Sequence, residues 1–292
     1  MFIRPPIARR FPPRGPPVRN NNQQPYPENS DDQQADEQFY PGVFDVLKVR
    51  HILLWKVRPE GLPVEVVDMI VDAAEYWPSA ECTLEERMRV STDIDRAVVC
   101  TSPFCYDENT LDTPSPKVLP HRTAHSCRKI MFTITSHDQG GYNESRLAGP
   151  DSPPVYGESY TWFDTEVIHN AQEPTQQEVI HTMMSPTELR KEHFPPTHPR
   201  LLPRGNALQR NRARRSRAKR HRIVWHHLDD IESDSPEAAE LERDSGRGRE
   251  TFNGKQVREM ELGDSIVVWA RARFAGWVNY VDEVSVRVFW AV

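Results

Sequence analysis

The last thirty residues, Gly263–Val292, alternate apolar and polar side chains in two runs that are separated by a short aromatic segment. The apolar positions are Ile266, Val268, Ala270, Ala272 and Phe274 in the first run, and Val284, Val286, Val288, Trp290 and Val292 in the second. Arg271, Arg273, Ser285 and Arg287 fall on the opposite side. Successive side chains of a strand point to opposite faces, so each run predicts a half-buried antiparallel strand.

Shorter segments repeat this signal upstream. RKIMFTITS after Ser126, YTWFDTEVIH from Tyr160 and RIVWHHL from Arg222 each alternate or carry β-branched and aromatic residues. We therefore predict a mainly-β fold, an antiparallel β-sandwich of jelly-roll-like type, assembled from strands far apart in the chain.

Composition sets the expected domain limits. Twenty-six prolines against thirteen glycines and a low mean hydropathy predict long irregular stretches. We expect a disordered proline-rich tail over 1–42, a small helical segment and linker over 43–118, and the sandwich over 119–292. Within the sandwich we expect disordered insertions near 140–158, 170–205 and 229–256.

The helical segment contains two apolar blocks separated by Pro59 and Gly61. The first is VFDVLKVRHILLWKV, and the second is LPVEVVDMIVDAAEYWP. In the second block apolar residues recur at helical spacing, with Pro78 as the stop, so we predict one helix with an apolar face. We expect another short helix around Leu84–Val90, followed by a linker over Thr101–Pro120.

The start of the second block resembles the opening helix of an F-box. Leu62, Pro63, Glu65, Val66 and Ile70 carry this resemblance over fewer than twenty residues. It implies that Leu62, Pro63, Val66 and Ile70 contact a Skp1-type adaptor of a ubiquitin ligase, with the β-domain as substrate reader. The second half of the F-box pattern is not recognisable after Pro78. A helix that packs on the sheet explains the same spacing, and both interpretations stay open.

The β-domain resembles a group of fungal proteins for which no activity is known. SHDQGG, YTWFD, IVWHHLDD and GDSIVVWARARFAGWVN carry this resemblance over about the last 170 residues. The chain departs from the pattern at Gly141, where an aromatic residue is expected, and in its basic run. The resemblance implies the fold of the domain and no function.

A ligand site can be proposed at the strand ends, where loops on a rigid scaffold carry binding residues. A sugar site combines a flat indole with carboxylate and amide partners. The candidate ligand-binding residues are His137, Asp138, Gln139, Trp162 and Asp164. Structural roles compete with this interpretation, because strand tryptophans belong mostly to cores and turn Asp residues bond their own backbone.

A basic run follows near Arg210. Its members are Arg210, Arg212, Arg214, Arg215, Arg217, Lys219, Arg220 and Arg222. Such charge density suits a nuclear import signal or a phosphate backbone, although no aromatic residue is interleaved before Trp225. A solvated charged loop is the competing interpretation, and a nucleic-acid partner is not favoured.

Catalytic signals are absent from the sequence. It has no HExxH, GxSxG, P-loop or dinucleotide fingerprint, and its four cysteines form no CxxC pair. No apolar run approaches the roughly 20 residues of a membrane span, and the net charge is only −6. We predict an intracellular, cytoplasmic or nuclear, non-enzymatic recognition module without metal or cofactor. It would bind a protein or a glycan through strand-end loops. The alternatives are an F-box-like adaptor and a nuclear nucleic-acid-associated protein.

Overall fold

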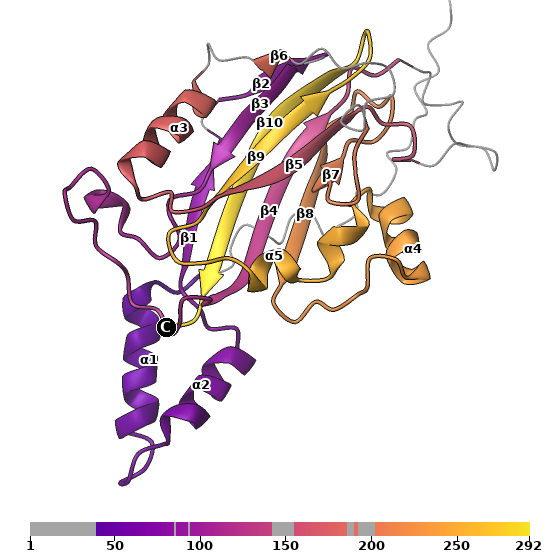
Figure 1. Cartoon of the computed structure of the whole chain (residues 1–292). Coiled ribbons are helices and arrows are strands. Elements are labelled where there is room, and N and C mark those ends of the chain that lie inside the picture. The colour runs from indigo at the N-terminus through magenta and orange to yellow at the C-terminus, as the bar shows by residue number, and fades with distance from the viewer. Residues whose placement is uncertain (1–38, 85, 93, 142–154, 186–189, 192–201) are drawn as a thin grey trace, which may run out of the picture. The chain divides into compact units, whose positions relative to one another are not determined.

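A computed structural model describes the chain from residue 39 onward (Figure 1). The described residues are 39–84, 86–92, 94–141, 155–185, 190–191 and 202–292. The expected tail over 1–42 and the expected insertion over 140–158 fall mostly outside them.

Two five-stranded antiparallel sheets confirm the predicted mainly-β, sandwich-like class. Sheet A has the order β1-β10-β4-β8, with β2 also paired to β10, and sheet B has the order β6-β3-β9-β5-β7. The strands of sheet A are β1 (Ser79–Thr83), β2 (Met88–Ser91), β4 (Cys127–His137), β8 (Lys219–His226) and β10 (Val278–Trp290). Those of sheet B are β3 (Ile94–Cys100), β5 (Thr161–Ile168), β6 (Arg190–Lys191), β7 (Gln209–Arg210) and β9 (Ser265–Ala272).

The two C-terminal runs form β9 and β10, which lie in different sheets. The aromatic segment between them therefore crosses from sheet B to sheet A, and Gly276 adopts a positive φ of 88° within it. In β10 the predicted alternation is correct: Val286 and Trp290 are buried, and Val286 pairs with Phe132 of β4. Phe274 differs from the prediction, because it lies exposed in the crossing segment.

The main core lies between the sheets. Its contributors include Phe132, Trp225 and Val286 from sheet A, and Phe163 and Val268 from sheet B. The rings of Phe132 and Trp225 meet edge to face with centroids 4.7 Å apart. Trp225 is therefore a core residue and does not offer a stacking surface to a ligand.

A second, smaller core forms on the outer face of sheet B. Helix α3 (Pro174–Met184) packs against β3 there and covers Ala97 and Val267, with Ile180 and Met183 in contact. The outer face of this sheet is therefore partly covered. This is why Trp269, which the alternation places on that face, is buried. Arg273 is also buried, beside Asp95 and the ring of Trp162.

Helices α1 (Val43–Trp55) and α2 (Val64–Ala73) form a hairpin beyond one end of the strands (Figure 1). Gly61 in the connection has φ +74°, and a Cβ there would lie 2.1 Å from the carbonyl oxygen of Leu54. Only glycine fits this turn. Pro63 is the N-cap of α2.

Several sequence expectations were wrong. Among the described residues of 84–90 no helix forms, and β2 begins at Met88. Because β1, β2 and β3 belong to the two sheets, 43–118 is not separate from the sandwich. The insertion expected over 229–256 contains ordered helices, as does part of 170–205. The remaining elements are α3, α4 (Pro236–Ser245), α5 (Lys255–Arg258), and the 3-10 helices η3 (Glu108–Thr110) and η6 (Arg249–Phe252).

Candidate functional site

The structure places His137, Asp138 and Gln139 at the end of β4, where their polar groups hold the corner together. Asp138 is fully buried and accepts hydrogen bonds from the backbone N–H groups of Gly140 and Arg214. Burial raises the pKa of Asp138, although these backbone hydrogen bonds oppose the rise. Gln139 Oε1 accepts the backbone N–H of Val278 at 2.9 Å. These contacts favour the competing structural interpretation for Asp138 and Gln139.

His137 is held in the same way. Its ring stacks on Tyr280 with centroids 4.8 Å apart, and its Nδ1 lies 2.6 Å from the carbonyl oxygen of Asp138. None of His137, Asp138 and Gln139 lines the cavity that Trp162 and Asp164 line. The five candidate ligand residues therefore do not form one site.

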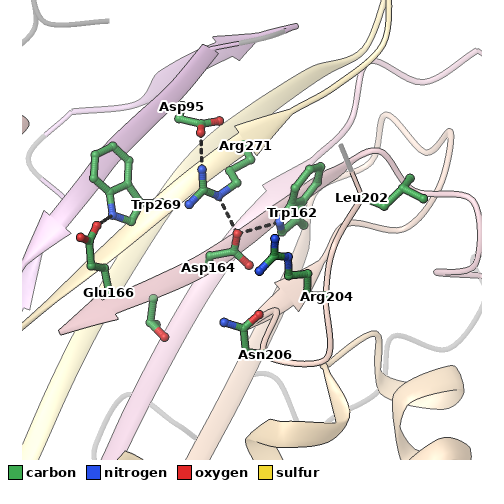
Figure 2. Close-up of a pocket in the computed structure, with 10 residues that line it drawn as sticks. Asp95, Trp162, Asp164, Glu166, Leu202, Arg204, Asn206, Trp269 and Arg271 are labelled. Atoms are coloured by element: carbon green, nitrogen blue, oxygen red, sulfur yellow. Dashed lines mark hydrogen bonds and ion pairs between the residues drawn. The ribbon is translucent and has the colours of Figure 1, made fainter. Parts of the chain in front are cut away.

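Trp162 and Asp164 lie on the outer face of sheet B, at the floor of a cavity of about 240 Å³ (Figure 2). Strand β5 presents Trp162, Asp164 and Glu166 on this face, because they are two residues apart. The neighbouring strand β9 adds Trp269 and Arg271, and β3 adds Asp95. The rest of the lining is Thr165, Leu202, Arg204 and Asn206.

A polar network fixes the floor of this cavity. Arg271 pairs with Asp95 and, through Nε, with Asp164 Oδ2 at 2.5 Å. The same Asp164 oxygen accepts the indole N–H of Trp162 at 2.9 Å. Burial raises the pKa of Asp164, and the charge of Arg271 opposes this rise. The floor is thus held in one arrangement before any ligand arrives.

The tryptophans are part of this floor and do not present open rings. Trp162 is 1% exposed and Trp269 is 3% exposed. The indole N–H of Trp269 donates to Glu166 Oε2 at 2.9 Å. The stacking role that the sequence suggested for Trp162 is therefore not available in this arrangement.

Six residues that line the cavity were not among the ligand residues predicted from the sequence: Asp95, Glu166, Arg204, Asn206, Trp269 and Arg271. Glu166 could have been found, since it follows Asp164 at the two-residue period of β5. Asp95 and Arg271 could not, because their sequence separation is 176 residues and only the strand register brings them together.

A different kind of surface occurs on the helical hairpin. Of the seventeen exposed large apolar side chains in the described part of the chain, ten lie between Phe39 and Ile70. Helix α2 buries Val67 and Val71 toward the sandwich. Its opposite face carries Val66, Met69, Ile70 and Ala73, which we call the α2 stripe. The outer residues of α1 are Phe44, Leu47, Ile52 and Trp55.

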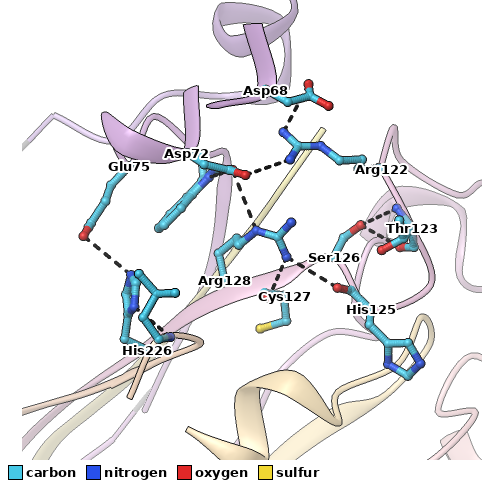
Figure 3. A network of polar contacts seen from close by, with 12 residues as sticks. Asp68, Asp72, Glu75, Arg122, Thr123, His125, Ser126, Cys127, Arg128 and His226 are labelled. Carbon is cyan, nitrogen blue, oxygen red and sulfur yellow. Dashed lines mark hydrogen bonds and ion pairs between the residues drawn. The ribbon is translucent and has the colours of Figure 1, made fainter. Parts of the chain in front are cut away.

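Ion pairs and hydrogen bonds attach α2 to the sandwich (Figure 3). Arg122 lies 2.8 Å from Asp72 Oδ2 and 3.4 Å from Asp68 Oδ1. Asp72 Oδ1 accepts the indole N–H of Trp77 at 2.9 Å and lies 3.7 Å from Arg128. Burial alone would raise the pKa of Asp72, but the hydrogen bonds from Trp77 and Arg122 outweigh it and lower that pKa.

The basic run lies in ordered structure. Arg210 pairs with Glu242 at 2.8 Å, Arg214 pairs with Glu158 at 3.3 Å, and Lys219 and Arg220 belong to β8. Arg212, Arg215 and Arg217 lie just before β8. Within the run only Lys219, Arg220 and Arg222 belong to this strand, which pairs with β4, so the import signal stays a prediction.

The thiols are suited to structural roles. All four cysteines are free, and burial raises the pKa of Cys100 and of Cys127 to about 12. Among the residues that the structure describes, no three His, Cys, Asp or Glu side chains are placed to hold a metal ion together.

Comparisons with protein-family models, curated proteins and solved structures found no match to this chain. No helix in the described ranges has the length and apolar character needed to cross a bilayer.

Proposed function

We propose that this protein is a non-catalytic interaction module that docks a protein partner on its helical hairpin. The observation that carries the proposal is the α2 stripe. Its residues recur at three- and four-residue spacing on the face of α2 that points away from the sandwich. Exposed apolar patches of this kind mark interaction surfaces in soluble proteins.

The degree of exposure supports docking. Met69 is 70% exposed, and Trp55 and Phe44 of α1 are 65% and 86% exposed. Burial of apolar surface is favourable by about 25 cal/mol for each Å² removed from water. A partner that covered these residues would recover that free energy, and helices dock in this way through residues at i, i+3, i+4 and i+7.

The proposed partner is a Skp1-type adaptor. The residues that resemble an F-box helix are available for contact: Pro63, Val66 and Ile70 are exposed, and Leu62 is half-buried. In this proposal the protein acts inside the cell, and the sandwich presents a substrate to a ubiquitin ligase. Binding through the strand-end loops is less well supported, because Asp138 and Gln139 already bond the backbone.

The experiment measures binding of the full chain to a purified Skp1-type adaptor by isothermal titration calorimetry. We expect binding by the natural sequence and at least a tenfold weaker affinity for Ile70→Asp and Met69→Asp. Val179→Asp is the matched control, because Val179 is an exposed apolar residue, at 42%, on helix α3, which packs on β3 of sheet B. Its affinity should not change.

Two results would overturn the proposal. The first is no binding of the adaptor by the natural sequence. The second is an equal loss for Val179→Asp, which would show a general effect of added charge. Light scattering after gel filtration adds a test of the occupant: a dimer that Ile70→Asp dissociates would assign the α2 stripe to a second copy of this chain.

A further inference from the structure

We infer that the cavity on the outer face of sheet B binds a small neutral polyhydroxylated ligand, of the chemical class of a single sugar ring. This site is separate from the α2 stripe and does not depend on the proposed adaptor. The inference is carried by the polar groups that the floor network leaves available and by the charge balance of the lining.

Four side chains retain hydrogen-bonding capacity toward the cavity. Asp164 contacts Trp162 and Arg271 through Oδ2 alone, and Glu166 contacts Trp269 through Oε2 alone. Their other oxygens are acceptors. Arg204 and Asn206 are exposed and make no side-chain hydrogen bond or ion pair within the described residues. They supply donors from the segment that follows Leu202 (Figure 2).

This combination matches hydroxyl groups. A hydroxyl donates one hydrogen bond and accepts others, so a ring bearing several hydroxyls can donate to carboxylates and accept from a guanidinium and an amide at once. The polar lining is nearly fixed in position on the β5 and β9 side, because Arg271 and both indoles hold the carboxylates. Fixed polar groups in a concave site give orientation and specificity to a small ligand.

The charges favour a neutral ligand. Three carboxylates, Asp95, Asp164 and Glu166, line the cavity together with the guanidinium groups of Arg204 and Arg271. A third guanidinium, that of Arg273, lies over the ring of Trp162 and pairs with Asp95 at 2.6 Å. The formal charges therefore cancel. The carboxylates would repel an anion and Arg204 would repel a cation, whereas a neutral ligand is repelled by neither.

The volume of the cavity also favours a ligand of the size of a single sugar ring. Pockets for drug-sized ligands range from roughly 300 to 1,000 Å³. The volume here is about 240 Å³. A single sugar ring suits this volume better than an oligosaccharide or a nucleotide. Because Trp162 and Trp269 are buried, recognition would come from hydrogen bonds and the indoles would report it without stacking on the ring.

The indole N–H groups provide the measurement. The full chain, labelled with ¹⁵N, is titrated with the methyl glycosides of glucose, galactose, mannose and N-acetylglucosamine, and the indole signals are assigned with Trp→Phe variants. At least one sugar should shift the signals of Trp162 and Trp269 saturably. Arg204→Ala and Glu166→Gln should each raise the Kd about tenfold, as expected for one hydrogen bond to a charged group.

The control is Arg58→Ala, which removes the same charge from an exposed position beside the hairpin. Its Kd should equal that of the natural sequence, and Ile70→Asp should also retain the sugar response. Absence of a saturable shift with all four sugars would overturn the inference. Tighter binding of glucuronate or of arginine than of every neutral sugar would overturn the assigned ligand class, and so would unchanged affinity in both cavity variants.

Discussion

Asp95 is the residue on which the outer face of sheet B depends most. It is 5% exposed and pairs with two guanidinium groups, Arg271 directly opposite on β9 and Arg273 at 2.6 Å. Arg273 is itself 1% exposed, and its guanidinium lies over the ring of Trp162 with 5.6 Å to the centroid. Removing the Asp95 carboxylate therefore takes an ion-pair partner from a buried cation.

We predict that Asp95→Ala costs about 3–5 kcal/mol in the free energy of unfolding, the range found when one partner of a buried ion pair is removed. Arg271 is buffered against the change because it keeps Asp164 at 2.5 Å. For a domain of this size each kcal/mol lowers Tm by roughly 2–4 °C. The expected fall is thus about 10 °C.

A double-variant cycle tests this prediction. Unfolding in urea at pH 7 is monitored by circular dichroism for each variant. Arg273→Met keeps the apolar stem and should cost about 1–2 kcal/mol, because Asp95 retains Arg271. Asp95→Ala with Arg273→Met should be more stable than Asp95→Ala alone, since the buried guanidinium that loses the Asp95 carboxylate is removed as well. A cost below about 1 kcal/mol for Asp95→Ala, or strictly additive costs, would refute the argument.

Two further predictions concern the end of the sandwich near the hairpin. Gly61→Ala should destabilise the hairpin by about 2 kcal/mol or more, because it combines a left-handed φ with a clash against Leu54. Faster amide exchange across α1 and α2, with β10 unchanged, would confirm this. Gly141→Ala is the control for the clash, because Gly141 also has a positive φ, +149°, but nothing lies within 4 Å of its Cβ position. His227 has a pKa lowered to about 4 by burial and by the charge of His226, so the unfolded chain binds a proton below about pH 6.5 that the folded chain does not. Stability should therefore fall between pH 6.5 and pH 4.5, and His227→Gln should flatten this fall in urea titrations. Asp72 and Glu75, with lowered pKa values, lose their contribution only below this window.

The strands that could be predicted are those in which apolar and polar side chains alternate, so that the apolar side chains identify the buried face. β4, β5, β9 and β10 each contain enough apolar residues on one face to identify the core side. β1 and β2 could not be found in this way. β1 is a polar edge strand, SAECT, and it is stabilised by its pairing with β10, in which Cys82 lies opposite Val286. The sequence around it has helical spacing, and this non-local pairing overrides the local preference.

Alternation identifies a face of a sheet but not what covers that face. Arg271 and Arg273 lie on the side predicted for them, yet that side forms the floor of a cavity and carries a helix at its other end. For the same reason only two of the five predicted ligand residues line one cavity. Trp162 and Asp164 share a strand face and reach the cavity, whereas His137, Asp138 and Gln139 belong to a corner of sheet A.

In the helical hairpin, too, the apolar spacing of a helix does not determine what covers its apolar face. The apolar spacing of Leu62, Val66 and Ile70 predicted a helix with one apolar face, and two uses of that face stayed open. The structure instead buries Val67 and Val71 and fastens the helix through Asp68 and Asp72 to Arg122. Because polar contacts already attach α2 to the sandwich, burial of the α2 stripe against the sheet does not explain its apolar character. An exposed stripe that the fold does not need for its own core is best explained by a partner that covers it.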